Sequence, residues 1–276
     1  MTPTVAALLL ALALGAAVAF ILREPLGHAW RRHRLGARPF PAAWRPILRR
    51  RVPAVRALPA DLQLRLKRRI PLFLAEVPIL GCRGLEVDDE MRVTIAALAC
   101  LPTLGRRSDA LSGLKQVLLY PGPFVVQQRQ VDGAGLVHED RSVRAGESWM
   151  QGQVVLSWDD VLAGAATPGD GHNVVIHEIA HQLDGDDGAM NGTPLLRGPR
   201  AARRWASVME PAYQALRERA EAGVPGLLDP YGATNRAEFF AVLSELFFER
   251  PQALAGTHPA VFDELRRYYR LDPLSW

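Results

Sequence analysis

The residues best suited to do chemistry are His177, Glu178 and His181, which form the pattern His-Glu-X-X-His inside an otherwise uncharged run. In a helix, positions i and i+4 lie on one face, about 6 Å apart. Both imidazoles can then bind one tetrahedral metal ion, and Glu178 beside them can act as a general base in hydrolysis. The alternative is a surface helix with solvated side chains. Apolar flanks would instead bury two imidazoles without partners, which is costly, so the motif favours a zinc hydrolase.

A zinc ion held by two histidines needs a third protein ligand and a position for water. Glu238 lies in the aromatic-rich segment 231–248 among apolar neighbours, so it is either a ligand or a residue at an exposed helix edge. Glu245, two turns later, shares its face and could orient a ligand histidine. Asp184, three residues after His181, could do the same or could simply end the helix.

The N-terminal segment 5–22 is eighteen uncharged residues long, the short end of the range for a membrane-spanning helix. We therefore expect a membrane anchor over residues 1–23. The alternatives are a cleaved signal peptide, since residues 17–19 read Ala-Val-Ala, and a buried soluble helix. Because the basic residues follow the apolar run, the positive-inside rule places the rest of the chain in the cytoplasm. The predicted location is the inner (cytoplasmic) membrane with a single pass; the alternative is the cytoplasm.

Charge is distributed unevenly along the chain. Residues 23–70 hold fourteen basic and two acidic side chains, whereas the chain as a whole has a net charge of only +4. Residues 24–38 are expected to be a basic juxtamembrane linker, and residues 23–70 to attract an anionic membrane surface. A nucleic-acid-binding arm is the competing interpretation, but nucleic acid is not an expected partner because the apolar segment precedes the basic one.

The remainder, residues 39–276, is long and apolar enough for one main globular domain. The two cysteines, Cys82 and Cys100, are too few to form a structural zinc site or a disulfide scaffold. Hydrophobic periodicity predicts helices at 42–51, 59–76, 91–101, 173–184, 200–222 and 236–249. Short β-branched stretches predict strands at 117–120, 123–132, 136–140 and 153–158. The expected fold class is α+β, with a small sheet packed on helices and an apolar helix before them.

Several separate motifs carry a family resemblance over residues 39–252. They are PFPAAWRPILRRRVP, DEMRVTIAALACL, GESWMQGQVVLSWDDVLAGA, DGHNVVIHEIAHQLD and YGATNRAEFFAVLSELFF, in this order along the chain. The sequence resembles the Mlc titration factor A (MtfA) family of zinc metallopeptidases, whose active site is similar to that of the catalytic domain of anthrax lethal factor. The resemblance implies a zincin-like fold of the gluzincin type. The family's commoner members are soluble, so the apolar segment 5–22 is a departure from them.

The resemblance also implies roles for individual residues. One Zn²⁺ per chain would be held by His177, His181 and Glu238, with Glu178 as general base and Tyr231 as a phenol that stabilises the oxyanion. The alternative for Tyr231 is a loop tyrosine hydrogen-bonded to backbone. The implied activity is hydrolysis of a peptide or protein substrate, with an aminopeptidase as the more specific expectation. The alternative function is a regulatory protein that sequesters a transcriptional repressor, with hydrolysis secondary.

Overall fold

The computed structural model describes residues 3–4, 20, 23, 27, 30–106, 110–131, 137–144, 146–149 and 152–276. The chain divides into two compact units, Met1–Phe40 and Pro41–Trp276. The predicted anchor, residues 1–23, lies outside the described residues except for residues 3–4, 20 and 23. Within the described ranges, no helix is both long and apolar enough to cross a membrane. The predicted boundaries after residues 23 and 38 stay predictions.

The second unit is mostly helical. Its α-helices are α2 (Trp44–Arg51), α3 (Ala60–Glu76), α4 (Asp89–Cys100), α5 (Trp158–Ala166), α6 (Val174–Asp184), α7 (Gly198–Glu221), α8 (Arg236–Glu249), α9 (Pro251–Thr257) and α10 (Pro259–Tyr269). Short 3-10 turns lie between or after them: η1 (Pro53–Arg56), η2 (Leu101–Thr103), η3 (Gly185–Asp187), η4 (Pro230–Ala233) and η5 (Pro273–Ser275). Six of the α-helices, α2, α3, α4, α6, α7 and α8, confirm the helices that periodicity predicts.

The strands form a four-stranded sheet and a separate hairpin. The sheet has the order β1-β2-β6-β5, from β1 (Ile79–Gly81), β2 (Gln116–Tyr120), β6 (Gln153–Ser157) and β5 (Gly146–Trp149). The first three strands run parallel, with Val117 opposite both Ile79 and Val154, and β5 runs antiparallel to β6 at the edge. The hairpin pairs β3 (Phe124–Val131) with β4 (Val137–Arg144). The crossover from β1 to its parallel neighbour β2 contains α4, whereas the connection from β2 to β6 runs through β3, β4 and β5.

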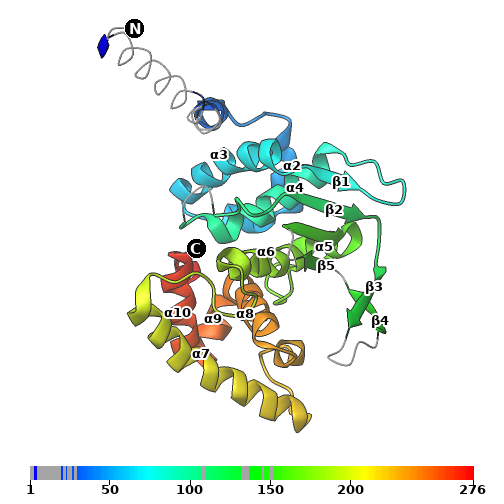
Figure 1. The fold of residues 1–276 in the computed structure, drawn as a ribbon, viewed down its shortest axis with the longest axis vertical. Coiled ribbons are helices and arrows are strands. Elements are labelled where there is room, and N and C mark those ends of the chain that lie inside the picture. Colours follow the sequence, from blue (N-terminus) through cyan, green and yellow to red (C-terminus); the bar gives the residue numbers. More distant parts are fainter. Residues whose placement is uncertain are drawn as a thin grey trace. The chain divides into compact units, whose positions relative to one another are not determined.

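Helix α6 lies between the sheet and the C-terminal helices (Figure 1). It packs on β5 and α4 on one side and on α8 on the other. Its partner α8 is buried from Glu238 to Phe248, and an aromatic cluster of Trp205, Phe240, Tyr268 and Tyr269 fills the space behind it. Two central helices therefore face each other inside the core, and polar side chains at their interface must find partners there.

Candidate metal centre

Helix α6 begins and ends where the sequence predicts. The side chain of Asn173 accepts a hydrogen bond from the backbone N–H of Ile176 (3.2 Å), the expected N-cap contact. Three residues of the motif, His177, Glu178 and His181, follow within the helix, and Glu178 and His181 are buried. The one-face placement of the two imidazoles is confirmed: their ring centroids are 4.9 Å apart.

Helix α8 supplies the third member of the site. Asn235 caps it by accepting from the backbone N–H of Glu238 (2.9 Å), so Glu238 stands in the first turn. The positive end of the helix dipole favours a carboxylate at this position. Glu238 is only 8% exposed and faces α6. The alternative of an exposed helix-edge residue is therefore wrong for Glu238.

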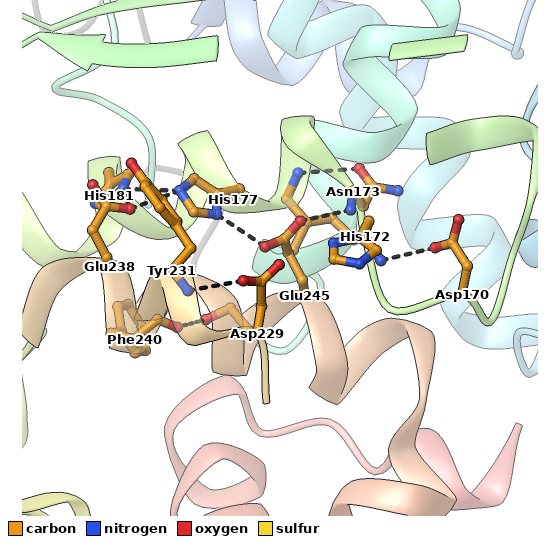
Figure 2. Close-up of polar contacts among 12 residues, drawn as sticks. Asp170, His172, Asn173, His177, His181, Asp229, Tyr231, Glu238, Phe240 and Glu245 are labelled. Atoms are coloured by element: carbon orange, nitrogen blue, oxygen red, sulfur yellow. Dashed lines mark hydrogen bonds and ion pairs between the residues drawn. The ribbon is translucent and has the colours of Figure 1, made fainter. Parts of the chain in front are cut away.

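Three ligand atoms converge on one point between the two helices (Figure 2). Glu238 Oε2 lies 3.0 Å from His177 Nε2 and 3.3 Å from His181 Nε2, and the two nitrogens are 3.2 Å apart. A tetrahedral zinc ion with bonds of about 2.0–2.1 Å requires its ligand atoms to be about 3.3 Å apart. The triangle formed by His177, His181 and Glu238 fits that requirement, and these residues form the metal-binding site.

Glu245 fixes the orientation of one ligand. Its Oε2 lies 2.9 Å from His177 Nδ1, so Nδ1–H donates to Glu245 and Nε2 is directed at Glu238 and His181. The predicted orienting role of Glu245 agrees with this contact. Three acceptor atoms that face one another repel unless a proton or a cation lies between them. The donor set of two imidazoles and a carboxylate is one that divalent zinc accepts.

The shifted pKa values of His177 and Glu238 also show that the cluster favours a positive charge. Burial alone lowers the pKa of His177, but hydrogen bonds to Glu238 and Glu245 and the charges of Glu245 and Glu178 outweigh it and raise the pKa to about 10. Burial likewise favours the neutral form of Glu238, yet its contacts with both histidines bring its pKa well below the usual range. Without a metal ion, a proton on His177 supplies the charge that the two carboxylates require.

The two residues expected to act on substrate lie beside this triangle. Glu178 is 2% exposed, and its charge acts on the neighbouring imidazole of His177. Tyr231 sits in η4, where Asp229 accepts from its backbone N–H (2.8 Å), and its ring centroid is 6.1 Å from that of His177. The ring is directed toward the cluster (Figure 2), and 41% of the residue is exposed. An exposed phenol next to a metal ligand is accessible to substrate; its catalytic role stays a prediction.

Asp184 does not orient a ligand. Its Oδ2 accepts from the backbone N–H of Gly192 (2.8 Å), so it ties the loop after α6 back to the end of that helix. The pKa of this fully buried carboxyl is raised to about 6, and burial is the largest cause. The prediction that Asp184 accepts from His181 has no support among the contacts of the described residues, and its role as the helix-ending residue agrees with the structure.

A cavity of about 770 Å³ adjoins the centre. Its wall includes Glu245 and Asp229, the residues that contact His177 and Tyr231 respectively, and much of the rest is apolar, for example Leu216, Val242 and Leu246. None of the three ligand residues lines it. The cavity therefore lies beside the site and not directly over the ligand atoms.

Two contacts were not foreseen from the sequence. Asn173 donates its side-chain N–H to Glu249 Oε1 (3.0 Å) and its backbone N–H to Glu245 Oε1 (2.7 Å). An Asn before an apolar helical run indicates an N-cap, but nothing in the spacing indicates that it also reaches a helix more than seventy positions later. That contact depends on how α6 and α8 pack.

Comparisons with known proteins agree with this geometry. The sequence matches the family described as glucose-regulated metallo-peptidase M90 over residues 27–270. An uncharacterized protein from Synechocystis sp. is 41% identical over 275 residues, covering 99% of both chains. Proteins named Mlc titration factor A are 35% identical in Enterobacter sp., over 81% of this chain and 84% of the relative, and 37% identical in Yersinia pestis, over 85% and 86%.

Proposed function

The chain belongs to the M90 family of metallopeptidases, and on that premise we propose that it is a zinc-dependent peptidase of the gluzincin type. One observation carries the proposal: two imidazole nitrogens and one carboxylate oxygen from α6 and α8 form a triangle of 3.0–3.3 Å with Glu178 beside it. His177, His181 and Glu238 are the proposed zinc ligands. Their spacing suits zinc, and their chemistry suits a site that leaves one position open.

Glu178 is the proposed general base. When bound, zinc would supply Lewis acidity, which lowers the pKa of a water molecule to about 7 and polarises a carbonyl group. The carboxylate of Glu178 accepts the proton of the attacking water and delivers it to the leaving amine. Its position supports this role, because the buried carboxylate lies on α6 directly after the ligand His177.

Tyr231 is the proposed oxyanion donor. As the tetrahedral intermediate forms, negative charge develops on the former carbonyl oxygen, and a phenol already in place donates to it with little reorganisation. The support is its position beside His177 and its exposed ring. The backbone contact with Asp229 holds η4, so the phenol is presented by a fixed turn rather than by a free loop.

The experiment that tests the proposal compares the zinc-loaded full chain with its Glu238→Ala variant on a panel of fluorogenic peptides. We expect the wild-type chain to hold about one zinc ion and to cleave peptides, and the variant to lose both properties. Each peptide is supplied with a free and with an acetylated N-terminus. Cleavage of the free form alone supports the aminopeptidase proposal, whereas equal cleavage of both forms indicates an endopeptidase. A Glu238→Ala variant with undiminished zinc affinity would show that the third ligand is misassigned.

A second candidate function is supported by the relatives named Mlc titration factor A. On that basis, the chain would bind and sequester an Mlc-type transcriptional repressor. Such binding need not use the metal centre. Capture of purified Mlc by the full chain, compared with a variant changed at His177, Glu178 and Glu238, separates the two functions: equal capture indicates a binding surface outside the site, and lost capture indicates that the site itself is involved.

The location proposed for the chain is the cytoplasmic face of the inner membrane. Its support is the apolar segment 5–22 and the basic residues that follow. A peptidase held there would act on cytoplasmic proteins or on peptides near the membrane surface.

A further inference from the structure

Asn173 makes more hydrogen bonds than a helix cap requires. Its Oδ1 accepts from Ile176 N–H, and this contact alone is the capping function. Its backbone N–H also donates to Glu245 Oε1 (2.7 Å), and its side-chain Nδ2 donates to Glu249 Oε1 (3.0 Å). Ser, Thr or Asp would cap α6 about as well, but none of them has a side-chain N–H to donate. The amide group of Asn173 is therefore used for something that capping does not explain.

These bonds form a continuous chain that ends at the metal site. The backbone N–H of Gly169 donates to Glu249 Oε2 (2.9 Å), and Glu249 Oε1 accepts from Asn173. Asn173 donates to Glu245 Oε1, and Glu245 Oε2 accepts from His177 Nδ1 (2.9 Å). Asn173 is 2% exposed and Glu245 is 7% exposed, so most of the chain is shielded from water. In this environment each bond constrains its neighbours strongly.

Electrostatics explains why the side chain that meets Glu249 is neutral and has an N–H to donate, beside the backbone N–H that meets Glu245. Glu245 and Glu249 are four positions apart on α8, so their carboxylates lie on the same face and repel each other. Burial raises the pKa of Glu249, and the nearby charges of Asp170 and Glu245 raise it further. Asn173 donates its backbone N–H to the carboxylate of Glu245 and its side-chain N–H to that of Glu249. The repulsion is thereby offset, and both side chains are held in position.

We propose that Asn173 and Glu249 are positioning residues of the metal centre: their hydrogen bond fixes the start of α6 against the end of α8, holds Glu245, and through Glu245 sets the imidazole of His177. The proposal rests on the zinc site of the proposed function but not on peptide hydrolysis. Neither residue touches a ligand atom, so an effect on zinc is indirect: it passes through Glu245 or through the position of the start of α6, where the backbone N–H of His177 donates to the carbonyl of Asn173 (2.9 Å). The expected effect is at the lower end of the range for residues that contact a ligand directly.

The test exchanges the donor and the acceptor of this one hydrogen bond in the full-length chain. Asn173→Asp keeps an oxygen for the N-cap but sets a carboxylate against Glu249. Glu249→Gln together with Asn173→Asp restores the bond in the reverse direction: the amide N–H of the introduced glutamine donates to the introduced aspartate, while the glutamine oxygen still accepts from Gly169. The total charge of the pair is unchanged. Asn173→Ser is the matched control, because its hydroxyl oxygen keeps the cap, and the substitution removes the amide N–H that reaches Glu249 without adding charge.

Zinc affinity is measured by competition with a chromophoric chelator, and the stability of the metal-free protein by urea denaturation. We expect Asn173→Asp to weaken zinc binding by about tenfold and the double variant to recover to within about threefold of wild type. Asn173→Ser should fall between them. A purely structural role would lower the stability of the metal-free protein and leave zinc affinity unchanged.

Two results would overturn the positioning role: zinc affinity of Asn173→Asp within about twofold of wild type, or a double variant that is no better than the single one. Failure of the proposed function looks different, because the wild-type chain itself would then bind no zinc. In that case both proposals fail together. If the wild-type chain binds zinc and the substitutions at Asn173 and Glu249 leave its zinc affinity unchanged, only the positioning role fails.

Discussion

Glu178 is the residue whose loss should separate binding from chemistry. It lies next to His177 on α6 but is not part of the ligand triangle. Glu178→Gln keeps the shape of the side chain and removes the proton acceptor, so we expect zinc content to stay at the wild-type level and peptide turnover to fall by about 10²–10⁴-fold. Metal analysis and kcat on the same preparation check this. Undiminished turnover in the zinc-loaded variant would reject Glu178 as the base.

Tyr231 is expected to act only in the transition state. Tyr231→Phe removes the hydroxyl and keeps the ring beside His177, so kcat should fall by about 100-fold while KM changes little. Steady-state kinetics of the two proteins give both constants. A variant with normal kcat would return Tyr231 to the alternative of a loop tyrosine with a structural contact.

The raised pKa of His177 predicts that zinc affinity depends on pH. In the metal-free protein His177 stays protonated up to about pH 10, so zinc must displace a proton, and its affinity should rise by up to about tenfold per pH unit between about pH 6.5 and 9. The same raised pKa contributes stability that is complete below about pH 6.5, the ordinary His value, and is lost as the pH rises through 10. Chelator competition and urea denaturation at three pH values test both signs. Affinity that is independent of pH would mean that the imidazole is neutral before zinc binds.

At the scale of elements, Gly192 lies in the loop before α7 and contacts both the end of α6 and the start of α8. Its φ is +76°, and an added Cβ would lie 2.2 Å from the carbonyl oxygen of Arg236. Its own N–H and C=O bind Asp184 and Trp205. Gly192→Ala must therefore strain the turn and displace the first turn of α8, which carries Glu238.

We expect Gly192→Ala to lower the free energy of unfolding by about 1–3 kcal/mol and to weaken zinc binding as well. Urea denaturation without metal measures the first effect. Gly188→Ala is the matched control, since Gly188 also has a positive φ of +89° but no atom within 4 Å of the added Cβ. Equal losses in both variants would show that backbone strain alone, and not the clash with Arg236, is responsible.

How much of the site the sequence predicts differs between its parts. His177 and His181 were predictable because helical spacing acts locally. For Glu238 the residues alone left two interpretations, and the family resemblance indicated the ligand; Glu245 followed because it shares a helix face with Glu238. The link from Asn173 to Glu249 depends on the packing of two helices distant in sequence, and no local pattern contains it. Strands β1 and β5 were not predicted, because they are three and four residues long, too short to show a clear alternation of apolar and polar residues. Helices α5, α9 and α10 were also missed, and the parallel pairing of β1, β2 and β6 required the three-dimensional structure.

At the scale of the whole molecule, part of the basic segment 23–70 is committed to the fold. Arg50 and Arg51 form ion pairs with Glu90, and Arg69 donates to Thr103 and to the carbonyl of Arg106 (2.5 Å). These guanidinium groups stabilise contacts of α2 and α3 with their surroundings. Fewer than fourteen cations are therefore free to meet an anionic lipid surface, and attraction to lipid alone would be weaker than the net charge suggests.

The apolar segment should decide where the full chain is found. We expect the wild-type protein to stay in the membrane fraction after carbonate extraction, and a Leu10→Arg, Leu14→Arg variant to move to the soluble fraction, because each arginine costs about 2.5–3.5 kcal/mol inside a spanning helix. N-terminal sequencing of the recovered protein identifies the rival outcome: a chain that begins after residue 19 has lost a signal peptide. Release of the intact wild-type chain by carbonate would contradict the anchor.

The two helices that share the metal lie far apart along the chain: 57 positions separate His181 from Glu238, and α7 occupies much of the interval. Closing so long a loop lowers the chain entropy before the contacts between the two helices can form and offset that loss. Zinc should therefore meet a complete site only after the folding transition state has passed. In stopped-flow experiments we expect zinc to slow unfolding by nearly its full binding free energy and to change the refolding rate less than about twofold. The metal would then stabilise the folded protein against unfolding without accelerating its folding.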